Sequence, residues 1–193
     1  MAVTPTLNGS ITNTTSTTST SFSLTMPSGI VAGELLVAYT FVSGSNAHSL
    51  SGWDNFDIVG NVTTGWIGLW GKTAVGSDTG TVTVSPSATG LFQTFRVGSW
   101  CKDLSQIVAD VVNPGGAGTS DPPSLNASIL REGLWIATAA GGGTPPTLTN
   151  PTNYTGVVQN NLAGAACIGI ARRAMTAVAS ENPGAFGGSM PSN

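Results

Sequence analysis

The chain repeats one pattern of apolar residues about a hundred positions further along. The run Glu34-Leu35-Leu36-Val37-Ala38 is matched by Gly133-Leu134-Trp135-Ile136-Ala137, Trp53 by Tyr154, and Ile67-Gly68-Leu69 by Ile168-Gly169-Ile170. The offsets agree closely, since 134 − 35 = 99, 154 − 53 = 101 and 168 − 67 = 101. Each copy then runs into an acidic turn, at residues 76–80 and 180–184. A duplicated unit of alternating apolar residues and glycine-rich turns predicts an architecture, but it indicates no particular chemistry.

The composition favours strands over helices. Charged residues make up only 8% of the chain, and it contains 26 glycines and 11 prolines. Ser, Thr and Asn must therefore hydrate the surface, and these residues compete with a helix for backbone hydrogen bonds. A length of 193 residues suits one large β domain. We therefore predict an all-β fold, namely an antiparallel β-sandwich, jelly-roll-like, that is built from two pseudo-repeated halves.

The strongest strand signal lies at residues 35–42, which are apolar on both faces. A strand of this kind is expected at the centre of a sheet that is covered on both sides. Residues 12–21 are almost pure Thr and Ser and predict an extended arm or an edge strand. Further strands are expected at residues 53–59, 66–74, 79–84, 91–97, 106–112, 134–139, 154–159, 165–176 and 185–186.

The same pattern predicts the domain organisation. We expect an N-terminal arm at 1–21, a duplicated sandwich at 22–187 and a C-terminal tail at 188–193. Repeat one covers about 22–105 and repeat two about 106–187. The second repeat has no counterpart of residues 91–97, so that one sheet edge is left open, and exposed edges are usually covered. Residues 3–11 of the same chain are the favoured filler, and a strand of a neighbouring subunit is the alternative.

Candidate catalytic groups are few. His48 is the only histidine, and a Ser/His/Asp arrangement would depend on it. Its position in a polar loop favours a solvated surface residue. Cys101 and Cys167 lie too far apart in sequence to suggest a structural zinc site, and Cys167 is expected as a buried free thiol. We predict no catalytic, cofactor-binding or metal-binding residues, no cofactor, and no enzymatic activity.

Four aromatic residues are candidates either for ligand contact or for packing: Trp53, Trp66, Trp70 and Tyr154. The nearby pair Asp54 and Asp57 could serve glycoside hydrolysis or calcium binding, and an exposed indole could stack on a sugar. The second copy keeps the ring, as Tyr154, without the acids. An aromatic shared by both copies favours packing.

The charge pattern argues against a nucleic-acid or membrane partner. The net charge is −3 with only six Lys and Arg, whereas nucleic-acid binding depends on clustered cations. The one basic doublet, Arg172-Arg173, is interpreted as a solvated strand end in preference to a phosphate site. No apolar run reaches the length of about 18 residues that a spanning helix needs. The first residues lack the pattern of a secretory leader, so we expect synthesis in a cytoplasm.

Several motifs resemble the duplicated β-sandwich structural proteins of tailed bacteriophages. They are the run Pro27-Ser28-Gly29-Ile30-Val31-Ala32-Gly33-Glu34-Leu35-Leu36-Val37-Ala38, then Ser51-Gly52-Trp53 and Lys72-Thr73-Ala74, and in the second half Leu134-Trp135-Ile136-Ala137, Asn153-Tyr154 and Glu181-Asn182-Pro183-Gly184-Ala185-Phe186. The resemblance spans roughly residues 20–187 and carries over no catalytic residue. Relatives of this kind usually continue into a further strand, so the early stop of the second half is a departure.

The resemblance implies a head decoration protein or a tail-associated module. The leading hypothesis is a non-enzymatic capsid decoration or cement protein that stabilises the phage head on the outer capsid surface of the virion. Its expected partners are the major capsid protein and further copies of the chain, with a homotrimer as one symmetry considered. A tail or fibre-associated protein and a carbohydrate-binding module are the alternatives. An enzyme that depends on His48 comes third.

Overall fold

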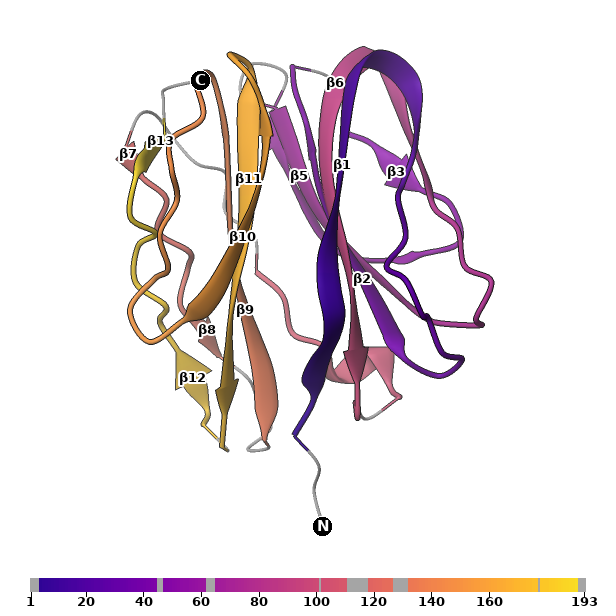
Figure 1. Ribbon diagram of the computed structural model, residues 1–193, viewed down its shortest axis with the longest axis vertical. Helices are drawn as coiled ribbons and strands as arrows, with labels where there is room; N and C mark the ends of the chain where they lie inside the picture. The colour runs from indigo at the N-terminus through magenta and orange to yellow at the C-terminus, as the bar shows by residue number, and fades with distance from the viewer. Residues whose placement is uncertain are drawn as a thin grey trace.

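The computed structural model describes residues 4–44, 47–61, 65–100, 102–110, 118–126, 132–176 and 178–190, and it confirms the predicted antiparallel β-sandwich. A large six-stranded sheet and a small three-stranded sheet pack face to face (Figure 1). The large sheet has the order β1 (Thr6–Ser23), β6 (Thr81–Gly98), β2 (Leu35–Val42), β5 (Gly65–Thr73), β4 (Asp54–Asn61), and β3 (Ser49–Leu50) also pairs with β6. The small sheet has the order β10 (Thr155–Leu162), β11 (Ala166–Met175), β9 (Gly133–Gly142).

Short elements cover the far side of the small sheet. β7 (Gly118–Thr119) pairs with β13 (Ser189–Met190), and β8 (Leu125–Asn126) pairs with β12 (Ser180–Glu181). Figure 1 shows these two pairs as an outer layer beside β9, β10 and β11. A single 3-10 turn, η1 (Leu104–Gln106), follows the large sheet.

Strand β2 lies at the centre of the large sheet and is buried along its whole length. Because successive side chains of a strand point to opposite faces, Leu35 and Tyr39 face the small sheet, whereas Leu36 and Val42 face away from it. The prediction of a central strand covered on both sides is confirmed.

Three hydrophobic clusters hold the layers together. The central core lies between the two sheets and takes side chains from both, whereas the large-sheet outer core and the small-sheet outer core lie on the two outward faces. The central core includes Leu35, Phe41, Ile67, Leu91, Phe95, Ile168 and Ile170; the large-sheet outer core includes Leu36, Trp53, Trp70, Val82 and Phe92; the small-sheet outer core includes Ala137, Leu148, Tyr154, Cys167 and Phe186.

Strands β1 and β6 form one long ribbon that closes the large-sheet outer core. The ribbon bends over the upper end of the molecule and descends on the outer side (Figure 1). The register shifts around Ser16 and Ser19, where the bend lies, and the far part of the ribbon then pairs Phe22 with Val82 over the outer core. Residues 12–21 thus belong to an edge strand, the second of the two forms expected for them.

The favoured filler for the small sheet is wrong. The start of β1 pairs with the end of β6, as in Leu7 with Val97, and so extends the large sheet. The small sheet therefore ends at β9, which pairs only with β11 among the described strands. The position that β6 fills beside β2 has no counterpart beside β9 in the described part of the chain.

Other strand expectations also differ in detail. Residues 79–84 and 91–97 are predicted as two separate strands, but the structure has one strand, β6. β1 pairs with β6 both before and after the stretch 85–90 that lies between the two predicted strands. Residues 106–112 are no strand as far as they are described, because η1 is followed by irregular chain to residue 110, and 111–112 lie outside the described residues. Residues 185–186 make no ladder; the neighbouring Gly187 bridges to Thr149. In the expected tail, Met190 is buried.

The triplets β2-β5-β4 and β9-β11-β10 share strand order and register. Leu35 pairs with Thr73 and Leu134 pairs with Ala174, so the offsets are 134 − 35 = 99 and 174 − 73 = 101. The second ladder matches as well, since each triplet has a register shift at the start of its edge strand, between Asn55 and Asp57 in β4 and between Thr155 and Val158 in β10. This agreement is what a duplicated plan predicts. The duplication itself, its division into two repeats and the jelly-roll connectivity stay predictions.

The turns that lead into the edge strands correspond too. The amide of Trp53 donates to the carbonyl of Leu50, and the amide of Tyr154 donates to that of Pro151. The residue before each aromatic has a positive φ, 76° at Gly52 and 65° at Asn153, and Gly and Asn are residues that tolerate this conformation. The same turn therefore places one aromatic ring on the outward face of each triplet.

Candidate functional site

His48 is buried, which corrects the expectation of a solvated loop residue. Its side chain is 4% exposed and lies on the outward face of the large sheet. Its Nε2 lies 2.6 Å from Oγ1 of Thr40, which also accepts from Nε1 of Trp70 at 3.0 Å. The Thr40 hydroxyl donates to the carbonyl of Gly68 at 3.1 Å.

This arrangement fixes the tautomer of the imidazole. A hydroxyl has one proton, and that of Thr40 goes to Gly68, so Nε2 of His48 must donate to the Thr40 oxygen. Burial lowers the pKa of His48 to about 4, because the charged imidazolium loses its hydration in the interior. His48 is thus neutral at physiological pH, and its buried Nδ1 has no hydrogen-bond partner among the described residues.

Because Gly68 has no side chain, the cluster of Thr40, His48 and Trp70 can pack directly against its backbone. A Cβ at Gly68 would lie 2.6 Å from the Trp70 nitrogen and 2.9 Å from the Thr40 oxygen. The corresponding Gly169 of the small sheet is covered by Leu148. In the small sheet an apolar side chain thus covers the glycine that His48 and its partners cover in the large sheet. This correspondence indicates a packing role for His48.

Trp53 lies in the large-sheet outer core, as the packing interpretation predicts. It is 7% exposed, and its Nε1 donates to the carbonyl of Thr79 at 3.3 Å. The ammonium of Lys72 lies 5.8 Å from the centre of its ring and 2.9 Å from Oδ1 of Asp78. Burial opposes ionisation of Asp78, but Lys72 and the amides of Val75 and Gly76 outweigh it and lower the pKa of this carboxyl.

The second triplet repeats this arrangement with other residues. Tyr154 is buried in the small-sheet outer core, and Arg173 pairs with Glu181 at 2.7 Å. Lys72 and Arg173 stand at corresponding positions, since 173 − 72 = 101. Burial and the charge of Glu181 raise the pKa of Tyr154 to about 12. In each half the acidic turn is therefore tied to the strand before it beside a buried aromatic ring.

The other candidate residues of the sequence form neither a metal site nor a pair of exposed aromatic rings in the described part of the chain. Trp70 is buried, and Trp66 is partly exposed. Asp54 is exposed at the start of β4, and within the described residues no cluster of His, Cys, Asp and Glu could hold a metal ion. Cys167 is a buried free thiol as predicted, its Sγ lies 3.3 Å from Sδ of Met190, and burial raises its pKa to about 11. Cys101 lies outside the described residues.

Buried amides join the two sheets at the edge where β1 and β6 meet β10. Asn160 donates to the carbonyls of Thr14 and Phe92 at 2.9 and 3.1 Å, and it accepts from the Thr15 hydroxyl at 2.8 Å. Gln93 donates to the carbonyl of Val158 at 2.9 Å. We call this group the amide latch, because it fixes one sheet to the other through directional bonds.

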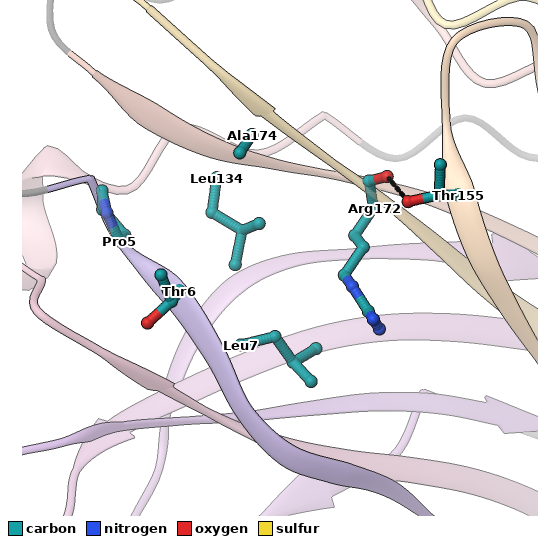
Figure 2. A pocket seen from close by; sticks show the side chains of 7 residues that line it. All are labelled: Pro5, Thr6, Leu7, Leu134, Thr155, Arg172 and Ala174. Atoms are coloured by element: carbon teal, nitrogen blue, oxygen red, sulfur yellow. Dashed lines mark hydrogen bonds between the residues drawn. The ribbon is translucent and has the colours of Figure 1, made fainter.

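At the lower end of the same interface, a pocket opens between β1 and the small sheet. It has a volume of about 270 Å³. Figure 2 shows Leu7 of β1, Leu134 of β9 and Arg172 of β11 around it. The full lining is Pro5, Thr6, Leu7, Leu134, Thr155, Arg172 and Ala174.

Arg172 is the chemically distinctive residue of this pocket. It is partly exposed, and within the described ranges no carboxylate lies at ion-pair distance from it, whereas the other two arginines of those ranges, Arg96 and Arg173, pair with Glu34 and Glu181. Sequence reasoning singled out the Arg172-Arg173 doublet but missed the pocket, because its lining comes from four strands. Arg173 pairs with Glu181 and stays partly exposed, so the interpretation of the doublet as a solvated strand end stays a prediction.

Compared with protein-family models, with curated proteins and with solved structures, the chain gives no match. Among the described residues, no helix has the length and apolar character that a membrane crossing requires.

Proposed function

We propose that the protein is a non-enzymatic structural component of a tailed-phage virion, namely a decoration or cement protein that binds the major capsid protein on the outer surface of the head. The observation that carries the proposal is the buried position of the reactive and aromatic side chains. His48, Trp53, Trp70, Tyr154 and Cys167 all lie inside the layers and hold them together. Such an interior suits a part whose task is cohesion.

The shape of the molecule supports the same proposal. Two sheets share one central core, the amide latch joins them at one edge, and an ion pair ties each acidic turn to the strand before it. A rigid body with few charges suits repeated binding on a symmetric shell, where many weak contacts add up. We expect self-association as a symmetric oligomer, with a trimer as the first symmetry to test.

Cryo-electron microscopy of purified virions tests the location. We expect density that fits this sandwich in symmetric groups on the outer face of the head. Density on the tail alone would replace the proposal by the tail or fibre alternative, and particles that lack the protein altogether would refute a virion role.

The carbohydrate-binding alternative now depends on Trp66. Trp53, Trp70 and Tyr154 are each less than a tenth exposed, so their rings offer no flat platform to a sugar. Trp66 is the one member of the four that remains partly exposed. Binding to a glycan array that is lost in Trp66→Ala, with the fold intact, would favour this alternative.

A further inference from the structure

We propose that the pocket around Arg172 binds a carboxylate that carries a short branched apolar group, with the guanidinium of Arg172 holding the carboxylate. Such a group occurs at the C-terminus of a polypeptide that ends in an apolar residue, and also in small branched carboxylic acids. The proposal is independent of where the protein resides.

The guanidinium is the group that can recognise the anion. It offers five N–H donors in a planar fork that matches the two oxygens of a carboxylate. The Thr155 hydroxyl already donates to the backbone carbonyl of Arg172 at 3.5 Å, and that of Thr6 faces Asn8 at 3.4 Å. The nearby Glu132 accepts from Thr4 and lies beyond ion-pair distance of Arg172. No acceptor among the described residues is bonded to the guanidinium of Arg172, so its donors can turn to a ligand.

The rest of the lining defines the second half of the ligand. Leu7 and Leu134 belong to the fringe of the central core, and Pro5 and Ala174 complete an apolar wall. A cavity of about 270 Å³ has room for a group of the size of one amino-acid residue. Arg172 is the one cation of the described lining, and one cation beside an apolar wall suits a monoanion with an apolar tail better than a phosphate, which would bring up to two charges.

Comparison of the two triplets indicates that packing does not demand the arginine. The position of Arg172 is that of Gly71 in the first triplet, since 172 − 71 = 101, and there the ring of Phe56 lies over the glycine. In the second triplet Gly156, at φ 63°, leaves the space over which the guanidinium lies, 3.2 Å from where a Cβ would stand. In the first triplet the space between these two strands is thus filled by the apolar ring of Phe56. In the second triplet it is filled by the charged side chain of Arg172, which borders the pocket.

Titration of the full chain with N-acetyl-leucine, followed by amide NMR shifts, tests the proposal. We expect saturable shifts at Leu7, Leu134 and Thr155 below about 20 mM, since a ligand of this size reaches roughly millimolar affinity. N-acetyl-leucinamide, which has the same shape without the charge, should bind at least about tenfold more weakly. Equal binding of the amide, or no saturable shift, would overturn the proposal.

Two further ligands identify the source of the carboxylate. Tighter binding of N-acetyl-leucine than of isovalerate supports a polypeptide C-terminus, and the reverse order supports a free branched acid. Inorganic phosphate should give no saturable shift at these residues. Phosphate binding as tight as that of the carboxylates would contradict the carboxylate assignment.

Variants then assign the binding to Arg172. Arg172→Gln should weaken N-acetyl-leucine binding by about tenfold or more, and Arg172→Lys by less, because a lysine keeps the charge and loses the fork. Lys102→Gln changes the net charge equally at an exposed residue outside the pocket lining, and should leave binding unchanged. The amide spectrum and a thermal melt report whether the variant is folded, and among the described residues Arg172→Gln removes no ion pair. Unchanged affinity in folded Arg172→Gln would refute the role of this residue.

Discussion

At the scale of single residues, the buried cluster of Thr40, His48 and Trp70 has the largest consequences. One hydroxyl satisfies two ring nitrogens and a backbone carbonyl in a space from which water is excluded. Removal of any member leaves buried partners without a hydrogen bond, which costs more than the bond itself contributes. The cluster therefore makes the large sheet sensitive both to substitution and to pH.

We expect the free energy of unfolding to fall as the pH drops from about 7 to about 5. His48 has a pKa of about 4 in the folded protein and about 6.5 when unfolded, so in this window the unfolded state takes up a proton that the folded state does not. Stability is complete above the unfolded pKa, and it is lost as the pH falls toward the folded pKa. The loss should reach about 2 kcal/mol at about pH 5.

Urea unfolding at the two pH values measures this difference. His48 is the only histidine, so the variant His48→Gln should remove most of the dependence between the two pH values. An equal loss of stability in the variant would assign the pH effect to other groups.

Thr40→Val should destabilise the protein by about 2–4 kcal/mol, since the variant keeps the shape but leaves the ring donors of Trp70 and His48 without the acceptor that they share. Thr94→Val is the matched control, because the buried Thr94 makes a single bond to the carbonyl of Thr25 and should cost about 1 kcal/mol. Chemical denaturation at neutral pH compares the two. Equal losses would mean that the whole cluster contributes no more than one ordinary hydrogen bond.

At the scale of elements, the amide latch makes one edge of the interface between the two sheets polar, where β1 and β6 meet β10. Most of the contact between the sheets is made by apolar side chains, which resist separation but fix direction weakly. Asn160 bonds the backbone of both β1 and β6, so β10 is held in one position along them. The latch thus sets how the small sheet lies on the large one.

Asn160→Ala should cost about 2–3 kcal/mol, because it leaves the Thr14 and Phe92 carbonyls and the Thr15 hydroxyl without this partner. Asn161→Ala changes the next residue of β10, which is exposed, and should cost about 0.5 kcal/mol or less. Thermal or urea unfolding of both variants checks the contrast. Similar small losses would show that the apolar contacts alone position β10.

Sequence patterns predicted most of the strands but not the contacts between them. The alternation of residues 35–42 predicted a central strand, and the offsets of 99 and 101 match the register of both triplets. The burial of His48 could not be foreseen, because its partners Thr40 and Trp70 lie on other strands and no local spacing relates them. The pocket could not be predicted for the same reason, because β1 and β11, which both line it, are far apart in sequence.

At the scale of the whole molecule, the central core belongs to neither half alone. It combines Leu91 and Phe95 of the large sheet with Ile168 and Ile170 of the small sheet. Separation of the sheets would expose both sets of side chains together. The sandwich should therefore unfold as a single cooperative unit.

Native-state hydrogen exchange tests this cooperativity. The slowest amides of β2 and of β11 should exchange with the same free energy, within about 1 kcal/mol, and that value should equal the global free energy of unfolding. A much lower value throughout β11 would show that the small sheet opens by itself.

The long β1–β6 ribbon also determines how the molecule bears mechanical load. The start of β1 and strand β13 lie toward opposite ends of the body (Figure 1). A pull between them runs along β1 and acts on its ladder with β6 in shear. Because the rungs of an antiparallel ladder lie across the strands, they share such a force instead of parting one at a time. Under the proposed capsid role, a stretched shell would load this backbone ladder and not only the side-chain contacts.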